Sequence, residues 1–369
     1  MKADNNTVQL YRSLSPLAFL YGIGVNVRNR LFDWGLLRSE SFDVPVICVG
    51  NLAVGGTGKT PHTEYIIRLL RERYRIAVLS RGYKRQTEGF VIAHPGSTSR
   101  EIGDEPYQMW RKFPDITIAV DADRRRGIRN LLALTEPNRP EVILLDDAFQ
   151  HRYVRASLYI VLTDYHRLYY RDKLLPVGRL REPSSGVRRA DVVIVTKCEP
   201  DIQSAEFEGI KKDMRLAASQ KLFFSHIVYG DLEPVFPGEA PPRSLGRIGK
   251  GSEVLLVSGI AHPEYFQEEV GRYTGGSTSL TFPDHHAFGK EDIQRIQTQL
   301  DCLSSADKLL IVTEKDAARL RDNPLLPAEW HAFLYQLPIT IGFLRDQGQA
   351  FNELISNHIS SLKRNYIAR

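Results

Sequence analysis

The stretch from residue 44 to residue 74 constrains the fold most, because it joins a strand, a glycine-rich loop and a helix in a fixed order. The strand is VPVICVG at 44–50, a β-branched run typical of a buried parallel strand. The loop, GNLAVGGTGKT, covers residues 50–60. In the segment PHTEYIIRLLRERY that follows, Tyr65, Ile66, Leu69 and Leu70 recur at helical spacing. This order predicts a phosphate-binding loop at the end of a parallel strand.

The residues of the loop suit ATP and Mg²⁺. Glycines let backbone N–H groups converge on phosphate oxygens, and the helix N-terminus adds partial positive charge. Lys59 can bridge the β- and γ-phosphates, so it also counts among the catalytic residues, and Thr60 can ligate Mg²⁺. Ala53 replaces the first glycine of G-x-x-x-x-G-K-[ST], which leaves a glycine-rich structural turn as the weaker alternative. The expected nucleotide-binding residues are Gly55, Gly56, Thr57, Gly58, Lys59 and Thr60.

A second strand, EVILLDDAFQH at 141–151, ends in two carboxylates. Ligands of open α/β sheets gather at the carboxyl ends of the strands. We therefore expect Asp146 and Asp147 to face the phosphates and, with Thr60, to hold Mg²⁺. The alternative is an Asp pair that caps a turn, which the nearby loop at Lys59 disfavours.

The length of 369 residues favours two domains. Strand signals at 75–80, 116–120, 158–163 and 191–197 alternate with helical segments, which predicts an α/β fold with a mainly parallel sheet domain of the P-loop NTPase type. A Pro- and Gly-rich stretch then precedes a second, smaller α/β domain. The expected segments are 1–40 (N-terminal membrane-interface helix), 41–225 (P-loop domain), 226–250 (linker) and 251–369 (smaller domain).

The N-terminal segment has no secretory pattern, but residues 14–27, LSPLAFLYGIGVNV, are almost wholly apolar. This run is shorter than the ~20 residues that cross a bilayer. Arg28, Arg30 and Arg38, with the aromatic Phe19 and Trp34, suit a helix that lies in the interface of an anionic membrane. A helix packed on its own domain is an equal alternative.

The charge and cysteine content exclude some classes of function. Lys and Arg number 49 against 44 Asp and Glu, a surplus too small to indicate a nucleic-acid partner. The three cysteines, Cys48, Cys198 and Cys302, lie far apart, which indicates neither a disulfide framework nor a zinc site. A reducing, cytoplasmic setting fits.

Several motifs, taken in order, give the chain a family resemblance. They are VGNLAVGGTGKTP, LSRGYKR at 79–85, IGDEP at 102–106, LLDDAFQH at 144–151, PVGRLREP at 176–183, SGIAHPEYF at 258–266, FPDHHAF at 282–288 and VTEKDAARL at 312–320. With them the chain resembles, nearly end to end, the tetraacyldisaccharide 4′-kinases, the lipid A 4′-kinases of Gram-negative bacteria. It departs from the family pattern at Ala148 and Lys84, where glycine is usual.

The resemblance implies transfer of the ATP γ-phosphoryl group to the 4′-hydroxyl of an acylated glucosamine disaccharide 1-phosphate, a lipid A precursor. It also implies a membrane-associated N-terminal helix, and hence a peripheral or monotopic protein at the cytoplasmic face of the inner membrane. We expect this lipid-linked sugar and an anionic membrane surface as partners, no nucleic acid, and a monomer.

The resemblance also assigns the chemistry. It implies that Asp104 is the base and that a histidine of the DHH triplet, His285 or His286, works with it. An Asp–His pair is chemically sensible, because a histidine titrating near neutrality can share the proton. Without the resemblance, a turn at GDEP and surface histidines are the better interpretation. Arg81, Arg179 and Arg181 are weaker candidates for binding substrate phosphate.

Two rival hypotheses belong to other classes. TKCE at 196–199 distantly resembles the guanine-reading element of GTPases, so a membrane-associated P-loop GTPase or ATPase regulator is the main alternative. The other is a membrane adaptor in which the nucleotide is only structural.

Overall fold

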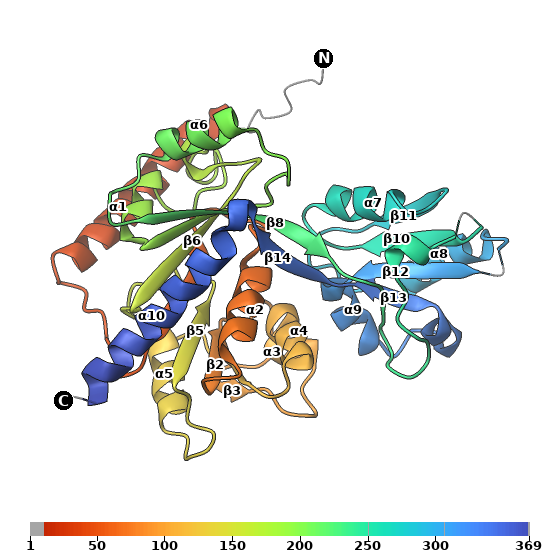
Figure 1. The fold of residues 1–369 in the computed structure, drawn as a ribbon, viewed down its shortest axis with the longest axis horizontal. Helices are drawn as coiled ribbons and strands as arrows, with labels where there is room; N and C mark the ends of the chain where they lie inside the picture. The colour runs from red at the N-terminus through yellow and green to blue at the C-terminus, as the bar shows by residue number, and fades with distance from the viewer. Residues whose placement is uncertain (1–10, 250, 306, 368–369) are drawn as a thin grey trace.

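Two mixed sheets, each covered by helices on both faces, form the protein (Figure 1). The computed structural model describes residues 11–249, 251–305 and 307–367. The expected α/β fold class is confirmed. Short 3₁₀ helices occur at Arg12–Leu14, Tyr169–Arg171, Ser184–Arg189, Leu245–Arg247, Ala328–Ala332 and Leu344–Asp346.

The larger sheet has the order β14-β8-β7-β6-β1-β5-β2-β4-β3. Neighbouring strands from β8 to β4 are parallel, and β14 and β3 are antiparallel edge strands. The strands are β1 (Val46–Asn51), β2 (Ile76–Ser80), β3 (Val91–Ile92), β4 (Thr117–Val120), β5 (Val142–Asp146), β6 (Leu158–Asp164), β7 (Val192–Thr196), β8 (Lys221–Tyr229) and β14 (Ile339–Phe343). Strands β1, β2, β5 and β7 are buried throughout, as their apolar sequences require.

Helices bury the apolar side chains on both faces of this sheet. One face is covered by α2 (Lys59–Leu70), α4 (Asp104–Lys112) and α10 (Gln347–Ile367), whose buried residues share a core with β1 and β5. The other face is covered by α5 (Arg124–Leu132) and α6 (Ser204–Met214). A short helix, α3 (Ser99–Ile102), leads into α4.

The smaller sheet has the order β11-β10-β12-β13-β9, with only β9 antiparallel. Its strands are β9 (Glu233–Pro234), β10 (Glu253–Ser258), β11 (Ser277–Thr281), β12 (Lys308–Thr313) and β13 (Leu334–Leu337). Helices α8 (Lys290–Asp301) and α9 (Glu314–Arg321) pack on one face. Helix α7 (Pro263–Gly271) packs on the other.

The chain crosses between the two sheets twice, through the antiparallel pair β8 and β14 (Figure 1). The expected smaller domain at 251–369 is therefore not one unit, because the end of the chain belongs to the larger sheet. Strand β14 joins the larger sheet, and α10 packs on it through Phe351, Ile355 and Ile359. The smaller unit also takes β9 from the expected linker at 226–250.

Helix α1 (Ser15–Asp33) has one packed face and one exposed apolar face. Ala18, Gly22 and Phe32 are buried, whereas Phe19 and Leu20 are 70% and 64% exposed. The helix therefore packs on its own domain and also presents apolar side chains outward. Among the described residues, no helix combines the length and apolarity needed to cross a membrane.

Candidate active site

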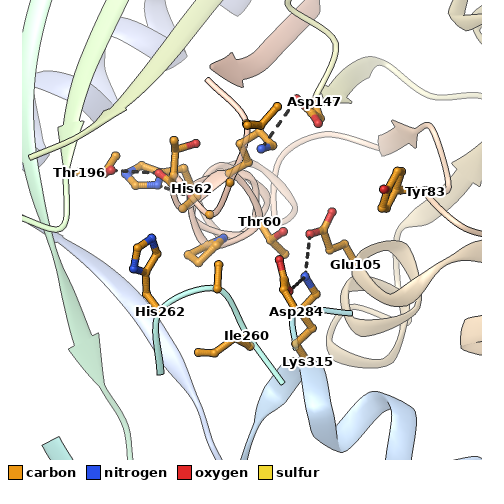
Figure 2. A pocket seen from close by; sticks show the side chains of 18 of the residues that line it. Thr60, His62, Tyr83, Glu105, Asp147, Thr196, Ile260, His262, Asp284 and Lys315 are labelled. Atoms are coloured by element: carbon orange, nitrogen blue, oxygen red, sulfur yellow. Dashed lines mark hydrogen bonds and ion pairs between the residues drawn. The ribbon is translucent and has the colours of Figure 1, made fainter. Parts of the chain in front are cut away.

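A cleft of about 940 Å³ lies between the two units, and both units contribute side chains to it (Figure 2). Residues 54–62 line it from the larger unit, and residues 260–262, 284–285 and 313–315 line it from the smaller unit. The nucleotide-binding residues expected from the sequence, Gly55, Gly56, Thr57, Gly58, Lys59 and Thr60, all belong to this lining. The sequence prediction and the geometry therefore agree on one location.

The loop between β1 and α2 depends on glycine where the helix begins. Gly58 has φ +84 and immediately precedes Lys59, the first residue of α2. A β-carbon at Gly58 would be strained in this left-handed conformation. The turn leaves the first N–H groups of α2 free to meet an anion, beside the Lys59 ammonium.

Buried polar contacts support the loop from behind. Asn51 Nδ2 donates to Thr57 Oγ1 at 2.7 Å, and Thr196 Oγ1 donates to the Thr57 carbonyl at 2.9 Å. His62 Nδ1 donates to the Gly58 carbonyl at 2.7 Å, so Nε2 accepts from the Ser225 hydroxyl at 2.9 Å. Burial lowers the pKa of His62 to about 4. These contacts hold the loop in shape, and no local pattern singled out His62 beforehand.

The two carboxylates after β5 differ in environment. Asp147 lines the cleft, and its Oδ1 lies 3.8 Å from Lys59 Nζ and 3.0 Å from Arg181 Nη1. Burial opposes ionisation of Asp147, but the charges of Lys59 and Arg181 outweigh it and lower the pKa of this carboxyl. Asp146 is fully buried behind it, within 3.4 Å of the Thr63 and Ser80 hydroxyls. Burial, with nearby Glu105 and Asp147, raises the pKa of Asp146 to about 7.

These donors fit a magnesium ion. Thr60 and Asp147 offer hard oxygen ligands on the same cleft wall, and Asp147 stays anionic at neutral pH. Within the described chain, no cluster of three or more His, Cys, Asp or Glu side chains could hold a metal alone. Mg²⁺ needs no such cluster, because it is usually bound by one or two carboxylates, water and substrate phosphates.

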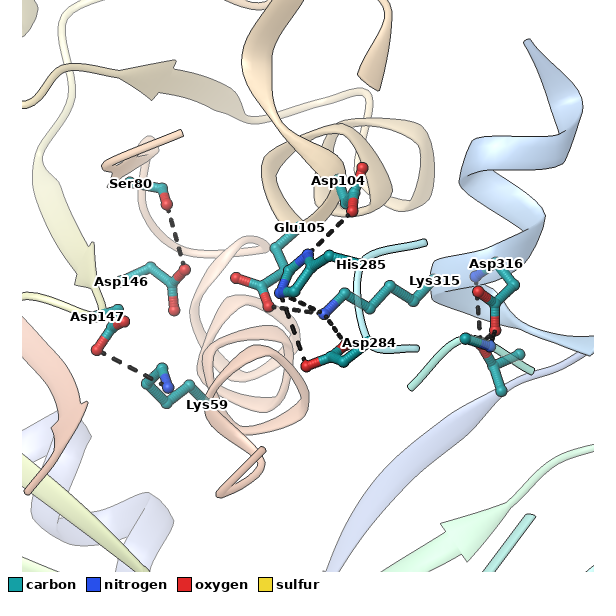
Figure 3. Close-up of polar contacts among 12 residues, drawn as sticks. Lys59, Ser80, Asp104, Glu105, Asp146, Asp147, Asp284, His285, Lys315 and Asp316 are labelled. Carbon is teal, nitrogen blue, oxygen red and sulfur yellow. Dashed lines mark hydrogen bonds and ion pairs between the residues drawn. The ribbon is translucent and has the colours of Figure 1, made fainter. Parts of the chain in front are cut away.

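A second polar centre joins the two units. Asp104 begins α4, and its Oδ2 lies 3.2 Å from Nδ1 of His285, which belongs to the loop after β11 (Figure 3). Arg319 of α9 also donates to Asp104 Oδ2, from Nε at 2.9 Å and from Nη2 at 2.8 Å. Although burial opposes it, hydrogen bonds from His285 and the Arg319 charge lower the pKa of Asp104. Asp104 is therefore a carboxylate at neutral pH.

The adjacent histidine has a different environment. His286 Nε2 lies 2.8 Å from Asp292 Oδ2, and its ring stacks on Phe282 at a centroid distance of 4.8 Å. The same Asp292 oxygen accepts from the Gly289 N–H at the start of α8. The structure therefore brings His285 to Asp104 and the cleft, and it leaves His286 within the smaller unit.

The three candidate arginines differ in their position relative to the cleft. Arg81 lines the cleft and is exposed, and Arg181 lines it while paired with Asp147. Arg179 is exposed and outside the lining, although its carbonyl accepts from the Val54 N–H at 2.8 Å. Arg81 and Arg181 thus lie in the cleft lining, whereas the Arg179 guanidinium lies beside the loop, with Nη1 3.8 Å from where a β-carbon on Gly55 would be.

Further charged and polar residues in the cleft were not expected from the sequence. Arg124 is only 2% exposed, and its Nε has no hydrogen-bond partner in the described chain. Burial lowers the pKa of Arg124 to about 10, so the guanidinium stays charged beside Asp147 and Asp146. The lining also includes Glu105, Gln150, Glu182 and Lys315. All four lie inside motifs that carry the family resemblance, which was the only signal for them.

A family model described as Tetraacyldisaccharide-1-P 4′-kinase matches residues 10–360. The chain belongs to the tetraacyldisaccharide 4′-kinase family. A curated relative of that name from Parabacteroides distasonis is 63% identical over 362 residues, or 98% of each chain. Another from Bacteroides thetaiotaomicron is 51% identical and covers 98% of this chain and 97% of its own.

A solved structure also matches almost the whole chain. It is a crystal structure of LpxK from Aquifex aeolicus in complex with ATP, with a TM-score of 0.70 and 29% identity. The match covers 94% of this chain and 99% of the other. The membership confirms the resemblance found from the motifs, and with it a phosphotransferase that acts on an alcohol group. The kinase interpretation is therefore supported over the regulatory GTPase or ATPase.

Proposed function

We propose that the protein transfers the γ-phosphoryl group of ATP to the 4′-hydroxyl of tetraacyldisaccharide 1-phosphate, a precursor of lipid A. One observation carries this proposal: the phosphate-binding loop of the larger unit and His285 of the smaller unit, whose Nδ1 bonds Asp104, line a single cleft. The loop suits a triphosphate, and the carboxylate suits a hydroxyl that must lose its proton.

The residues of the loop divide the work of phosphoryl transfer. The first amides of α2 and Lys59 bind the triphosphate, and Arg181 and Arg124 add positive charge near its end. Mg²⁺, held by Thr60 and Asp147 with Asp146 behind them, would neutralise charge on the phosphate oxygens.

The acceptor side requires a proton acceptor. Every hydrogen bond of the Asp104 side chain in the described chain goes to Oδ2, which leaves Oδ1 for the 4′-hydroxyl. The hydroxyl oxygen attacks the γ-phosphorus, and its proton passes to Asp104 Oδ1. The bond from the γ-phosphorus to the bridging oxygen breaks, and its electrons stay on ADP.

The lipid end of the proposed substrate favours a position at a membrane. The exposed face of α1 carries Leu17, Phe19, Leu20, Ile23 and Val27, and Arg28 and Asn29 of the same helix line the cleft. An interfacial helix beside the site would let acyl chains stay in lipid while the sugar enters. The exposed apolar face supports a peripheral protein, and we propose that it binds an anionic membrane at the cytoplasmic face of the inner membrane, where the family resemblance puts it. A monomer suffices, because one chain supplies both walls of the cleft.

The test is phosphate transfer from γ-labelled ATP to tetraacyldisaccharide 1-phosphate. Asp104→Ala should lower kcat by about 100-fold or more while the KM for ATP stays nearly unchanged, because Asp104 acts on the acceptor. Lys59→Ala should abolish most transfer through loss of nucleotide charge neutralisation. A near-normal kcat for Asp104→Ala would show that Asp104 is not the base. If the intact protein transfers no label to the lipid, the proposed activity is wrong.

A further inference from the structure

Two cations on one face of α9 hold the Asp104–His285 pair. Lys315 and Arg319 lie four residues apart, so their side chains project to the same side of the helix. Their side chains are 17% and 7% exposed. Lys315 reaches from the smaller unit toward Glu105 (Figure 3), and Arg319 donates to Asp104 at the start of α4.

The contact of Lys315 determines which ring nitrogen of His285 carries the proton. Lys315 Nζ lies 3.1 Å from His285 Nε2. An ammonium group has three donors and no acceptor, so Nε2 must accept this hydrogen bond. The proton of the neutral ring is then on Nδ1, which donates to Asp104 Oδ2 at 3.2 Å. The other tautomer would set two donors against each other at Nε2 and two acceptors against each other at Nδ1. Arg319 Nη2, a donor, also faces Nδ1 but lies farther away, at 3.5 Å.

Arg319 holds Asp104, which accepts the hydrogen bond from His285. Its Nε and Nη2 donate to Asp104 Oδ2, and its Nη1 donates to Asp316 Oδ1 at 2.8 Å and to the Gly259 carbonyl at 3.0 Å. Asp316 is fully buried, and its Oδ2 accepts from the Gly259 N–H at 2.9 Å. The guanidinium is therefore held by a rigid framework and keeps Asp104 oriented with Oδ1 free.

The remaining groups around His285 compensate the charge of Lys315. Its Nζ lies 3.5 Å from Glu105 Oε1 and 3.4 Å from Asp284 Oδ1. The ring of Tyr83 contacts His285 edge-on, with centroids 5.3 Å apart. With two carboxylates and an imidazole as partners, Lys315 is poorly placed to act as a free phosphate-binding cation.

We propose that Lys315 is a positioning residue that locks His285 in the Nδ1–H tautomer, so that His285 donates to Asp104 and leaves Oδ1 as the proton acceptor. The proposal rests on the proposed function, because it deepens the role of the same pair. In this arrangement His285 has no free nitrogen, so it orients Asp104 and takes no proton from the hydroxyl. His285, Lys315 and Arg319 come from the smaller unit, and Asp104 comes from the larger one. The Asp104–His285 hydrogen bond therefore forms only when the two units are in contact.

Nitrogen NMR of the full-length protein labelled with ¹⁵N-histidine tests the tautomer directly, because protonated and bare ring nitrogens differ greatly in chemical shift. Loss of one signal set in His285→Gln assigns the residue. We expect a protonated Nδ1 and a bare Nε2 in the unaltered protein and in Lys315→Arg, which keeps donors at this position. Lys315→Met should shift the population toward Nε2–H. If Lys315→Met leaves the His285 shifts unchanged, the proposal is wrong.

Kinetics on the same variants separate positioning from substrate binding. Lys315→Met should lower kcat about 10- to 100-fold with both KM values within about threefold, and Lys315→Arg should recover most of the rate. Lys290→Met, at an exposed lysine outside the cleft lining, is the matched control and should match the unaltered protein. A tenfold higher KM with unchanged kcat would make Lys315 a binding residue and overturn the proposal.

The two proposals fail in different ways. If Asp104→Ala keeps a normal rate, the assignment of the base fails, whatever the NMR shows. If Asp104→Ala is inactive but the His285 tautomer is the same in Lys315→Met as in the unaltered protein, only the positioning role of Lys315 fails. Should Lys315→Met not fold, Lys315→Leu replaces it, because it also removes every donor at this position and carries the same expected shift toward Nε2–H.

Discussion

Asp147 and His285, two of the expected site residues, have left-handed backbones, which residues other than glycine rarely adopt. Asp147 has φ 47 and His285 has φ 60. Such a conformation costs roughly 1–2 kcal/mol for most residues, less for aspartate. Contacts with the surrounding elements offset this strain. Asp147 follows the buried strand β5, and His285 is held between Asp104 and Lys315. Lys84, where the family usually has glycine, also has φ 59, so that departure keeps the conformation that glycine would favour.

His151 links the cleft to the pH dependence of stability. Burial, with Arg124 nearby, lowers its pKa from 6.5 to about 4. As pH falls from 6.5 toward 4, the unfolded chain binds this proton before the folded one, so the stability is complete above pH 6.5 and is lost below it. Because the side chain is 23% exposed, we expect a loss of only about 1 kcal/mol at pH 5.

His151→Gln should remove that part of the pH dependence. Urea unfolding at pH 5 and pH 7.5 measures it: the variant should lose less stability on acidification than the unaltered protein. His94→Gln, at an exposed histidine, serves as the control. An identical pH slope for His151→Gln and the unaltered protein would refute the argument.

At the scale of the elements, the exposed apolar face of α1 predicts membrane binding. Leu20 and Ile23 lie one turn apart on its exposed face, and burying each in lipid would contribute about 1.5 kcal/mol. Leu20→Ser/Ile23→Ser should therefore weaken binding to anionic vesicles by at least about tenfold in a sedimentation assay. Activity on acceptor dissolved in detergent should persist, because neither residue lines the cleft.

The matched control for α1 replaces exposed apolar residues elsewhere. Tyr273 and Leu325 are 40% and 48% exposed on the smaller unit. Tyr273→Ser/Leu325→Ser should bind vesicles as tightly as the unaltered protein. Equal loss of binding in both double variants would mean that α1 has no special role at the membrane.

The elements also show how far the sequence could predict the fold. Strand β1, helix α2 and strand β5 follow from local patterns, since apolar runs and the glycine loop lie within one segment. The return of β14 and α10 to the larger sheet depends on pairing of Ile341 with Ile227, residues more than a hundred positions apart. No local pattern could reveal it.

The site was predictable to a similar extent. Lys59, Thr60 and Asp147 belong to motifs whose chemistry is readable. The choice between His285 and His286 depends on the turn at φ 60, which sends one ring toward Asp104 and the other toward Asp292. Lys315 and Arg319 meet Asp104 only through contact between the units, so their roles could not be read from spacing.

At the scale of the whole molecule, a buried ion network joins the units. Lys112 Nζ of α4 lies 2.7 Å from Glu64 Oε2 of α2 and 2.5 Å from Glu314 Oε1 of α9. The two carboxylates are 1% and 7% exposed. Glu314 Oε2 also accepts from the Ile339 N–H at the start of β14. The network therefore fastens the smaller unit to the larger one beside the strands that connect them.

Removal of Lys112 should destabilise this contact in a pH-dependent way. Burial, with nearby Glu64, raises the pKa of Glu314 to about 7. In Lys112→Met the two buried carboxylates lose their shared cation, which should cost about 3 kcal/mol of unfolding free energy at pH 8. Below the raised pKa of Glu314 the folded protein takes up a proton there, so the loss should be much smaller at pH 5.5.

Urea unfolding of Lys112→Met at the two pH values measures this difference. Lys363→Met is the matched control, because Lys363 pairs with Glu141 within the larger unit at 2.6 Å and is partly exposed. Its effect should be below about 1 kcal/mol at pH 8. X-ray scattering of Lys112→Met should also show a larger radius of gyration at pH 8 than at pH 5.5, since repulsion between Glu64 and Glu314 opposes contact of the units. Equal destabilisation at both pH values, with unchanged scattering, would show that charge in this network does not hold the units together.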